Sequence, residues 1–263
     1  MNVKSIDGGN SFDFGKTSDD YGKYRDIYPQ SMYQKLIEFG IGKSEQNILD
    51  LGSGTAVLPV NMHQTNAHFT ATDISENQIK VGKQIVQSQN IDNISFKVCS
   101  AENTGFEDNT FDCVTAVQCF QYFNADIASK EIFRILKPNG LFCKIFMDWL
   151  PYQDKIIAEA EQLVHKYNPA WSGCGFEKFR YNYPQWAENG FIIDTIHSYN
   201  TEIKFSKDAW IGRMKSCRGV GASLSAQKVA EFENEYRQVL KKYPSDNLLL
   251  KHQIHIEIYK AIK

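Results

Sequence analysis

The residues best suited to chemistry stand in the stretch NILDLGSGTAVLPV, residues 47–60. An apolar run meets Asp50, and Gly52 and Gly54 follow with one residue between them. Glycines at the end of a strand let the backbone turn tightly and approach a ligand closely. The dinucleotide fingerprint needs a third glycine where Val57 stands, and no Gly-Lys-Ser/Thr follows this corner as in a phosphate loop. The acid at this corner disfavours a diphosphate and favours a ligand with a positive group.

Polar or small residues also follow the next three predicted strands. Asp73 ends the second strand, nineteen residues after Gly54, where a carboxylate can bind both hydroxyls of a ribose. The run 100–102, Ser-Ala-Glu, ends the third strand, and Gln118 ends the fourth. Ligands of open α/β sheets bind beyond the carboxyl ends of the strands, so we expect these residues to line one edge.

The elements that must position these residues alternate between strand and helix from residue 47 to residue 147. Apolar runs predict strands at 47–52, 68–73, 94–101, 111–120 and 141–147. Helical spacing predicts helices at 31–40, 56–64, 75–90 and 128–140, with Ser75 and Gln78 forming a capping box. This alternation predicts a parallel sheet with right-handed crossovers and helices on both faces.

After residue 147 the alternation stops. We expect a long helix at 154–167, a strand at 191–199, an irregular stretch from 201 to 225, a helix at 226–243 and an alternating strand at 252–262. In the irregular stretch, Gly219 is expected to end a helix and Ser223 or Ser225 to cap the next one. The chain has no internal repeat, so one domain with inserted elements is predicted.

Composition restricts the partners and the compartment. The 263 residues carry a net charge of -2, which gives no electrostatic reason to expect nucleic acid or an anionic membrane. The polar first fifteen residues lead us to expect no signal peptide, and the absence of an apolar run of about 20 residues leads us to expect no membrane span. Six scattered cysteines indicate free thiols in a cytoplasmic protein. No metal site is expected, because His252 and His255 point to opposite faces of a strand. The oligomeric state stays open.

Four stretches together carry a resemblance to a known family: ILDLGSGTA, ATDIS, CSAENTGFEDNTFDCVTA and RILKPNGLF. The chain resembles the Rossmann-like S-adenosylmethionine-dependent methyltransferases, in the small-molecule branch of the ubiquinone-biosynthesis and trans-aconitate type. The resemblance covers residues 20 to 147 well and the remainder loosely. It implies an α/β, doubly wound, mostly parallel seven-stranded sheet with an antiparallel last strand, helices on both faces and a helical cap inserted in the C-terminal half.

The resemblance also implies how the domain is organised. Residues 1–263 would form one methyltransferase domain around a cofactor-binding core at 46–147. Residues 1–45 would supply a lid and a helix. The cap would comprise 148–190 and 200–250, and the last strands 191–199 and 252–263.

Carried over position by position, the resemblance implies a site for S-adenosylmethionine. Gly52, Ser53 and Gly54 would lie against its methionine part, with Asp50 facing the amino group. Asp73 would bind the ribose. The adenine would meet Ile74, Ser100, Ala101 and Glu102, and Gln118 would approach the methionine end. Two positions depart from the family: Ala56 replaces a glycine, and Ser100 stands where relatives often have an aspartate.

The opening segment DYGKYRDIYP resembles the lid of this branch. Tyr21 and Tyr24 could close over the site, and Arg25 could pair with the cofactor's carboxylate, since a guanidinium binds a carboxylate with two hydrogen bonds. The alternative for Arg25, a surface arginine on a helix, is equally open.

The acceptor site has weaker signals. Arg213 and Arg218, near SCRGVGASL, could bind an acidic group, although the loop also has a structural interpretation as a helix end and a cap. Tyr122, Trp149 and Trp171 are candidates for an aromatic pocket, and core packing explains each of them as well.

Transfer of a methyl group from a sulfonium is an in-line displacement with a neutral leaving group. Holding the reactants in line can supply most of the acceleration, and no single catalytic residue is predicted. Two other functions stay open: an enzyme that uses the same cofactor without methylating, for example by cyclising it, and a binding protein that has kept the fold. A nicotinamide dehydrogenase is weaker, because Val57 and Asp50 oppose it.

Overall fold

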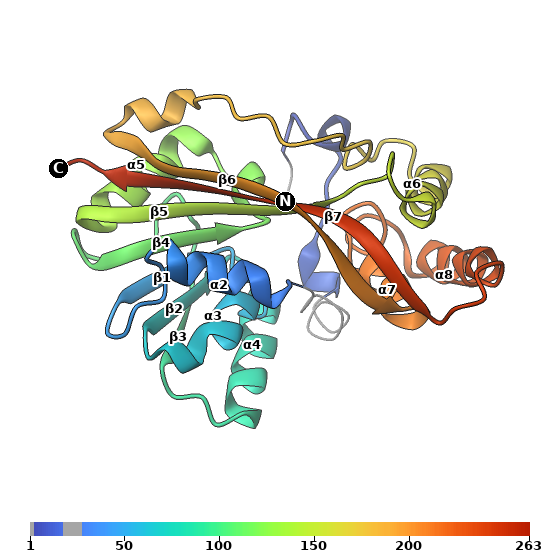
Figure 1. Ribbon diagram of the computed structural model, residues 1–263, viewed down its shortest axis with the longest axis horizontal. Coiled ribbons are helices and arrows are strands. Elements are labelled where there is room, and N and C mark those ends of the chain that lie inside the picture. Colours follow the sequence, from blue (N-terminus) through green and yellow to red (C-terminus); the bar gives the residue numbers. More distant parts are fainter. Residues whose placement is uncertain (1–2, 18–27) are drawn as a thin grey trace. The chain divides into compact units, whose positions relative to one another are not determined.

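The computed structural model describes residues 3–17 and 28–263, which form two compact units (Figure 1). The sheet unit comprises Tyr28–Met147, Arg180–Tyr199 and Ile254–Lys263. The helical unit comprises the described residues of 1–27 together with Asp148–Phe179 and Asn200–Gln253. Each unit is described by itself below.

One seven-stranded sheet runs in the order β3-β2-β1-β4-β5-β7-β6. The first five strands pair in parallel, and β1 lies between β2 and β4, where the strand order reverses. This is the predicted doubly wound topology. The strands are β1 Asn47–Leu51, β2 His68–Asp73, β3 Ile94–Val98, β4 Phe111–Val117, β5 Leu136–Trp149, β6 Phe191–Ser206 and β7 Asn247–Ala261.

The last strand, β7, runs antiparallel to β5, as Figure 1 shows and as the family resemblance predicts. Three pairs of side chains in contact show the direction of the pairing. From one pair to the next, the residue number rises by two along β5 and falls by two along β7. Such a sequence of partners is characteristic of antiparallel pairing on one face of a sheet. The pairs are Phe142 with Tyr259, Lys144 with Glu257, and Phe146 with His255.

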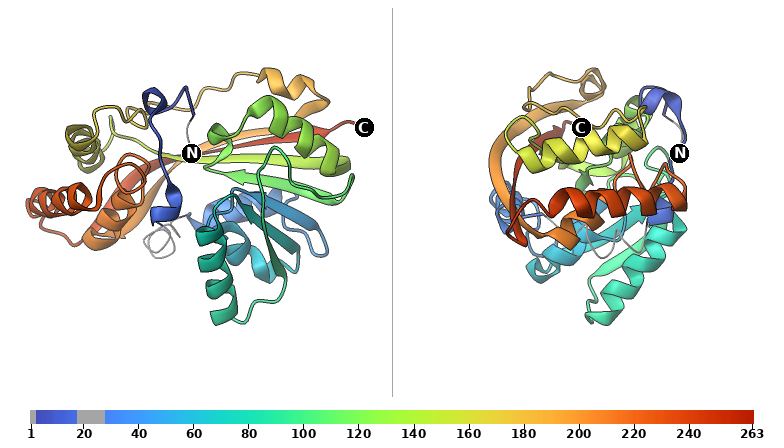
Figure 2. Two further views of the ribbon diagram at one scale, coloured as in Figure 1. Left: turned by 180° about the vertical axis from the view of Figure 1, so that it is seen from behind. Right: turned by 90° about the vertical axis from the view of Figure 1, so that its right-hand side faces the viewer.

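Helices cover both faces of the sheet (Figure 2). Helix α5 packs in one core with Leu49, Val114 and Phe142. Gly82 of α4 lies against Phe96, whose register partners place it on the opposite face. The helices are α2 Gln30–Glu38, α3 Val57–Met62, α4 Glu76–Ser88, α5 Ala125–Ile135, α6 Lys155–Tyr167, α7 Lys207–Lys215 and α8 Ala226–Leu240, with 3-10 turns η1 Asp7–Gly9, η2 Phe14–Thr17, η3 His63–Thr65, η4 Phe120–Tyr122 and η5 Gln185–Glu188.

Helix α4 begins as predicted in one respect and differs in another. The hydroxyl of Ser75 accepts a hydrogen bond from the Gln78 amide at 3.4 Å, so Ser75 is the N-cap. The reciprocal half of the capping box is wrong, because the Ser75 amide donates to Asp73 at 2.8 Å. A carboxylate two residues upstream therefore takes the place of the Gln78 side chain.

The stretch from 201 to 225 is more regular than predicted. Strand β6 continues to Ser206, because Ile203 and Phe205 are buried while Glu202 and Lys204 are exposed, which is the period of a strand. Helix α7 follows and ends at Lys215, so Gly219 does not end a helix. Ser225 caps α8, as one of the two predicted alternatives has it.

Helix α5 is also shorter than the predicted 128–140 at its carboxyl end. It stops at Ile135, and the chain enters β5 at Leu136. Proline lacks the amide hydrogen that a helix requires, and the residue before it avoids helical angles, so Pro138 excludes the last predicted turn.

The centre of the sheet is buried on both faces, as parallel strands between helices should be. Ile48 and Leu49 of β1, and Cys113 and Val114 of β4, are fully buried. All six cysteines are free thiols, of which Cys99 and Cys174 are half-buried and the others buried. Within the described residues, no helix combines the length and apolar character needed to cross a membrane.

We expect Asp154→Ala to lower the free energy of unfolding by about 1–2 kcal/mol. Asp154 caps α6, where Oδ1 accepts from the amides of Ile156 at 2.9 Å and Ile157 at 3.3 Å, and Oδ2 accepts from Lys251 at 3.1 Å. Asp154→Asn is the matched control, because asparagine caps helices as well as aspartate. Urea denaturation measures both variants, and equal losses for alanine and asparagine would contradict the capping role.

Candidate functional site

The predicted glycine corner follows β1 in a left-handed backbone conformation. Gly52 and Gly54 both have φ of 58°, and Ala56 has φ of 66°. A Cβ on Gly52 would lie 2.9 Å from the Cβ and Sγ of Cys119 and 3.3 Å from Phe123. Glycine at position 52 is therefore required twice, by the backbone angle and by the close approach of the β4 end. Ala56 adopts the same conformation at a cost in backbone strain.

Asp50 is buried beneath this corner. Its Oδ1 accepts from the hydroxyl of Thr115 at 2.7 Å. Burial raises the pKa of Asp50 to about 6; the hydroxyls of Ser53 and Thr115 oppose the rise, and the nearby Asp73 adds to it. Within the described residues, no lysine, arginine or histidine side chain pairs with it. The corner thus contains a carboxylate that lacks a cationic partner, as a site for a positive group would.

Asp73 connects the ends of β1 and β2. Its Oδ2 accepts from the Gly54 amide at 3.0 Å, and its Oδ1 accepts from Ser75 at 2.8 Å. Burial raises the pKa of Asp73, and these backbone hydrogen bonds oppose the rise. The backbone of Ile74 also hydrogen-bonds to Asp73, and because a carboxylate can accept about four hydrogen bonds, some acceptor capacity remains for a ligand. Ile74 beside it is 57% exposed, an apolar side chain at the carboxyl edge of the sheet.

The residues after β3 form a compact turn. The hydroxyl of Ser100 donates to Glu102, and the Glu102 amide donates back to that hydroxyl at 3.1 Å. The other oxygen of Glu102 accepts from the amide of Asn124 at 2.8 Å. Ala101 is buried in the same core as Cys119. Glu102 therefore fixes the approach of the chain into α5 at the edge where the adenine is predicted.

Gln118 ends β4 with φ of 59°, an uncommon conformation for a residue other than glycine. Its amide donates to the carbonyl of Ile145 at 2.9 Å, and its side-chain nitrogen donates to the carbonyl of Met147. These contacts fasten the end of β4 to β5. Strained backbone of this kind is concentrated at functional sites, because the surrounding structure must hold it in place.

The structure brings most of the predicted cofactor residues to one edge of the sheet unit. They lie at or directly after the carboxyl ends of β1 to β4, as the pattern of strand ends predicts. Tyr24 and Arg25, together with Tyr21, lie outside the described residues. The residues at this edge are Asp50, Gly52, Ser53, Gly54, Asp73, Ile74, Ser100, Ala101, Glu102 and Gln118.

The predicted acceptor residues fall in both units. Tyr122 lies in η4 of the sheet unit, half-buried against the core that contains Phe120. Trp149, Trp171 and Arg213 lie in the helical unit, where the Arg213 guanidinium is 5.0 Å from the Trp149 ring. The two tryptophan rings are 6.4 Å apart.

Arg218, the remaining acceptor candidate, already has an anionic partner. Its Nε donates to Asp7 at 2.7 Å, and its Nη2 donates to the other oxygen of Asp7 at 3.1 Å. Ser172 also donates to Asp7, at 2.9 Å. Within the helical unit, this arrangement joins the N-terminal segment to the loop after α6.

Three further residues of the site were missed from the sequence. Thr115 is a hydroxyl inside an apolar strand, and that unusual composition was the available signal. Thr55 is 1% exposed, and its hydroxyl lacks a hydrogen-bond partner among the described residues. Buried hydroxyls are normally satisfied, so a ligand at the glycine corner can supply the partner. Cys119, which contacts Gly52, gave no signal of its own.

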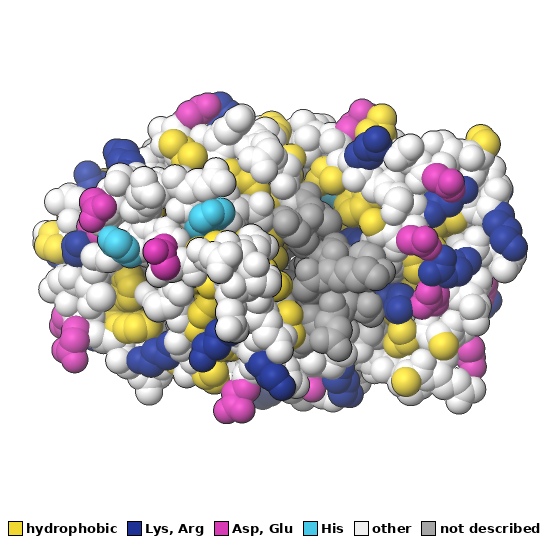
Figure 3. Space-filling view, turned by 90° about the horizontal axis from the view of Figure 1, so that it is seen from below, with side chains coloured by type: hydrophobic (Ala, Val, Ile, Leu, Met, Phe, Trp, Pro, Cys, Tyr) yellow, Lys and Arg dark blue, Asp and Glu magenta, His cyan; other side chains and the backbone are white. Residues whose placement is uncertain are grey.

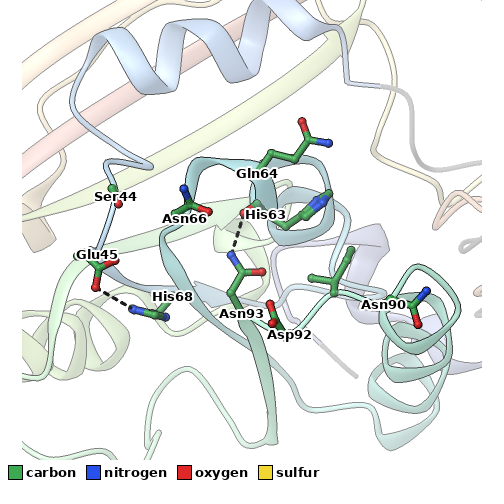
Figure 4. Close-up of a pocket in the computed structure, with 10 residues that line it drawn as sticks. Ser44, Glu45, His63, Gln64, Asn66, His68, Asn90, Asp92 and Asn93 are labelled. Carbon is green, nitrogen blue, oxygen red and sulfur yellow. Dashed lines mark hydrogen bonds and ion pairs between the residues drawn. The ribbon is translucent and has the colours of Figure 1, made fainter.

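A polar hollow lies elsewhere on the sheet unit, at the loops that precede β1, β2 and β3 (Figure 4). Its polar groups already make hydrogen bonds within the protein. The side-chain amide of Asn93 donates to the backbone carbonyls of His63 and Ala67, both at 2.8 Å. His68 lies 3.5 Å from Glu45 at the exposed rim. The predicted cofactor and acceptor residues do not line this hollow, and it is at the opposite ends of these strands from the glycine corner.

Comparison with known proteins agrees with this geometry. A family model described as a methyltransferase domain matches residues 42–198. A ubiquinone/menaquinone biosynthesis C-methyltransferase from Desulfotalea psychrophila is 35% identical over 127 residues, which are 46% of this chain and 48% of that protein. The chain thus spans about half the length of this relative.

Solved structures show the same fold. The YcgJ protein of Bacillus subtilis matches with a TM-score of 0.56 at 18% identity, covering 89% of this chain and 100% of that one. The [4+2]-cyclase SpnF matches with a TM-score of 0.54 at 16% identity, covering 88% of this chain and 80% of that one. Similarity at this level of identity concerns the fold alone.

We expect Gly52→Ala to lower the free energy of unfolding more than Gly105→Ala, by about 1–3 kcal/mol. Both glycines have positive φ, 58° and 63°. A Cβ on Gly105 would meet only the flexible end of Lys97 at 3.4 Å, whereas a Cβ on Gly52 would meet Cys119 at 2.9 Å. Thermal or urea denaturation measures the difference, and equal losses would mean that Cys119 does not crowd position 52.

Proposed function

The chain belongs to the methyltransferase-domain family, and from this premise we propose that it transfers a methyl group from S-adenosylmethionine to a small organic acceptor. The observation that carries the proposal is the buried Asp50 carboxylate, which has no cationic partner among the described residues. The amino group of the cofactor's methionine part is a cation that would pair with it. A diphosphate at the same corner would meet two carboxylates, those of Asp50 and Asp73, and would be repelled.

The residues of the corner fit this cofactor. Gly52 and Gly54 adopt a left-handed conformation, and without side chains their backbone is free to lie directly against the cofactor. The buried hydroxyl of Thr55 offers a hydrogen bond. In the proposal, the remaining acceptor capacity of Asp73 binds the ribose, and the exposed Ile74 covers one side of the adenine. Ser100, Ala101 and Glu102 border the adenine on the adjacent turn, and Gln118 borders the methionine end.

When bound, S-adenosylmethionine supplies an electrophilic methyl group on a positively charged sulfur, and the departing thioether is neutral. The chain therefore does not have to protonate a leaving group. Its contribution in the proposal is to orient the reactants and exclude water, which can account for most of the acceleration. Ser53 and Gly54 fix the backbone against the cofactor, since the Ser53 amide donates to the Thr72 carbonyl at 2.8 Å.

The remaining assignments are finer parts of the same proposal. Tyr24 and Arg25 would close the site, Arg25 by pairing with the cofactor's carboxylate. The cap role of residues 148–190 and 200–250 stays a prediction.

On the face drawn in Figure 3, basic and acidic side chains are interspersed, which favours a small acceptor over a polyanion. The six free thiols support a cytoplasmic location.

The first test is binding of S-adenosylhomocysteine, the demethylated product, measured by titration calorimetry. We expect Asp73→Ala to weaken binding by about 10- to 100-fold, because hydrogen bonds to a charged group contribute about 1.5–3 kcal/mol. Asp92→Ala, an exposed aspartate in the loop before β3, is the control and should bind as the unchanged protein does. Absence of binding at millimolar concentration, or equal affinity for Asp73→Ala, would refute the cofactor assignment.

A second measurement separates methyl transfer from the rival use of the same cofactor. Mass spectrometry after incubation with S-adenosylmethionine alone should recover the cofactor intact apart from its slow spontaneous breakdown. A cyclic amino acid formed at a rate proportional to enzyme concentration would favour intramolecular attack instead. A chain that binds the cofactor and converts no acceptor in a panel of small acids, phenols and amines would favour the binding-protein alternative.

The affinity for S-adenosylhomocysteine should rise as the pH increases from about 5 to 7 and then level off. The pKa of Asp50 is raised to about 6 in the free protein, so Asp50 is protonated below this value and cannot pair with an ammonium group. Asp50→Asn retains the shape and should bind weakly, with little change over this range. Calorimetry at several pH values tests this, and a pH-independent affinity in the unchanged protein would exclude Asp50 as the partner of the amino group.

A further inference from the structure

A threonine lies in the middle of the sheet, where a hydroxyl is unusual. Thr115 is fully buried and stands between Val114 and Ala116 in the centre of β4. Parallel strands that are buried on both faces normally consist of apolar residues, and a buried hydroxyl costs free energy unless it is hydrogen-bonded. Valine has nearly the same shape and would avoid this cost. The hydroxyl therefore indicates a role that valine could not fill.

The hydroxyl of Thr115 donates to the carboxylate of Asp50. The distance from Oγ1 of Thr115 is 2.7 Å to Oδ1 of Asp50 and 3.4 Å to the backbone carbonyl of Leu49. A hydroxyl has one hydrogen, and hydrogen bonds to an ionised acceptor are the shorter and stronger ones. The carboxylate is therefore the principal acceptor while Asp50 is charged, and the Leu49 carbonyl is a second acceptor when Asp50 is neutral.

The sheet register explains why this threonine reaches Asp50. Asp50 pairs with Ala71 of β2 on one side and with Thr115 of β4 on the other. Ala71 has no polar side-chain atom. Thr72, the next residue of β2, donates its one hydroxyl hydrogen to the backbone carbonyl of Asp50 at 3.2 Å. Of the two strands that flank β1, β4 thus supplies the side-chain hydrogen bond to the carboxylate within the described residues.

The surroundings of Asp50 make its charge costly. Burial raises the pKa of Asp50 to about 6, and the carboxylate of Asp73 at the end of β2 adds to the rise. The thiols nearby are neutral, because burial raises the pKa of Cys119 on the β4 side and of Cys143 on β5 well above the usual value. No cationic side chain among the described residues offsets this cost. Hydrogen bonds to the charged form are therefore what favours ionised Asp50 before a ligand binds.

Two hydroxyls favour the charged form of Asp50, and they differ in position. Ser53 and Thr115 both lower the pKa of Asp50. Ser53 belongs to the glycine corner, where the proposed cofactor would lie against it, so its effect cannot be separated from contact with the ligand. Thr115 is fully buried inside the sheet and can act on a ligand only through Asp50.

We propose that Thr115 is a positioning residue that keeps the Asp50 carboxylate charged and oriented, and thereby sets the preference of the site for nucleosides whose tail carries an ammonium group. The inference rests on the proposed function and names what selects its cofactor. S-adenosylmethionine and its demethylated product both carry this ammonium group. An analogue in which a hydrogen atom replaces the amino group offers Asp50 no cation, so the hydroxyl of Thr115 should not matter for its binding.

The test compares S-adenosylhomocysteine with this deaminated analogue by titration calorimetry between about pH 5 and about pH 8. In Thr115→Val, the pH at which the affinity for S-adenosylhomocysteine is half of its plateau should rise by about one to two units. The reason is that the carboxylate loses a hydrogen bond that favours its charged form. At about pH 7, the preference for S-adenosylhomocysteine over the analogue should fall by about two- to ten-fold. Thr115→Ser keeps the hydroxyl and should restore both quantities.

Thr72→Val is the matched control. It removes a buried hydroxyl beside the same residue, but one that donates to the backbone of Asp50 and not to its carboxylate. The pH midpoint and the preference should both stay unchanged in this variant. If Thr115→Val does not fold, Thr115→Ala and Thr115→Ser replace it as a pair, because both lose the methyl group and only serine keeps the hydroxyl. The alanine variant should then show the shift and the serine variant should not.

The measurements separate two failures. Failure of the unchanged protein to bind S-adenosylhomocysteine would overturn the proposed function. Normal binding with a midpoint and a preference that Thr115→Val does not move would overturn only the assignment of Thr115. Equal loss of affinity for both ligands, with the midpoint in place, would mean a merely structural threonine and would overturn this assignment too. So would equal affinities of the unchanged protein for the two ligands.

Discussion

The hydrogen bonds of Asp73 to the amides of Gly54 and Ser75 join the turns after β1 and β2. Asp73 is the last residue of β2, and its carboxylate accepts from the turn after β1 as well as from its own turn. The two turns therefore depend on each other. This places a second negative charge beside the buried Asp50, and their repulsion contributes to the raised pKa of Asp50. Among the described residues, the corner therefore contains two carboxylates that no cationic side chain balances. Such a corner is most stable with a cation in it, which links the local structure to the kind of ligand it can accept.

The fold follows from the sequence where one pattern dominates. The runs of β1, β2 and β4 are short, apolar and bounded by turn residues, and their predicted and observed limits agree within a few residues. The acids and glycines at their ends could be placed on one edge because parallel strands bring their carboxyl ends together. The end of β6 was placed too early although its signal was present in the sequence. In 201–206, Ile203 and Phe205 alternate with polar residues, and the burial follows the same alternation.

The residues of the candidate site could likewise be predicted only in part from the sequence. Asp50, Gly52 and Asp73 could be recognised because their types and spacing are unusual in a strand–turn–helix sequence. The partners that set their properties could not, because Thr115 and Cys119 come from a strand more than sixty residues away. The pairing of Lys144 with Glu257 is further still from any local pattern, because the two residues are 113 positions apart in sequence. Local spacing thus identifies the candidate binding residues, and only the sheet register identifies the residues that pack against them.

The two faces of the sheet carry different groups at its carboxyl edge, and this difference helps to explain how one fold can support different reactions. A [4+2]-cyclase has a similar fold at 16% identity, so the fold alone does not decide the chemistry. Asp50 and Thr115 lie on one face of the sheet, since they are register partners, whereas the row of Leu51, Ala116 and Lys144 has the opposite orientation. Residues on the face beneath α5 can therefore be substituted without direct contact with Asp50 or Thr115. This separation would let that face change in evolution while the glycine corner and its two carboxylates stay the same.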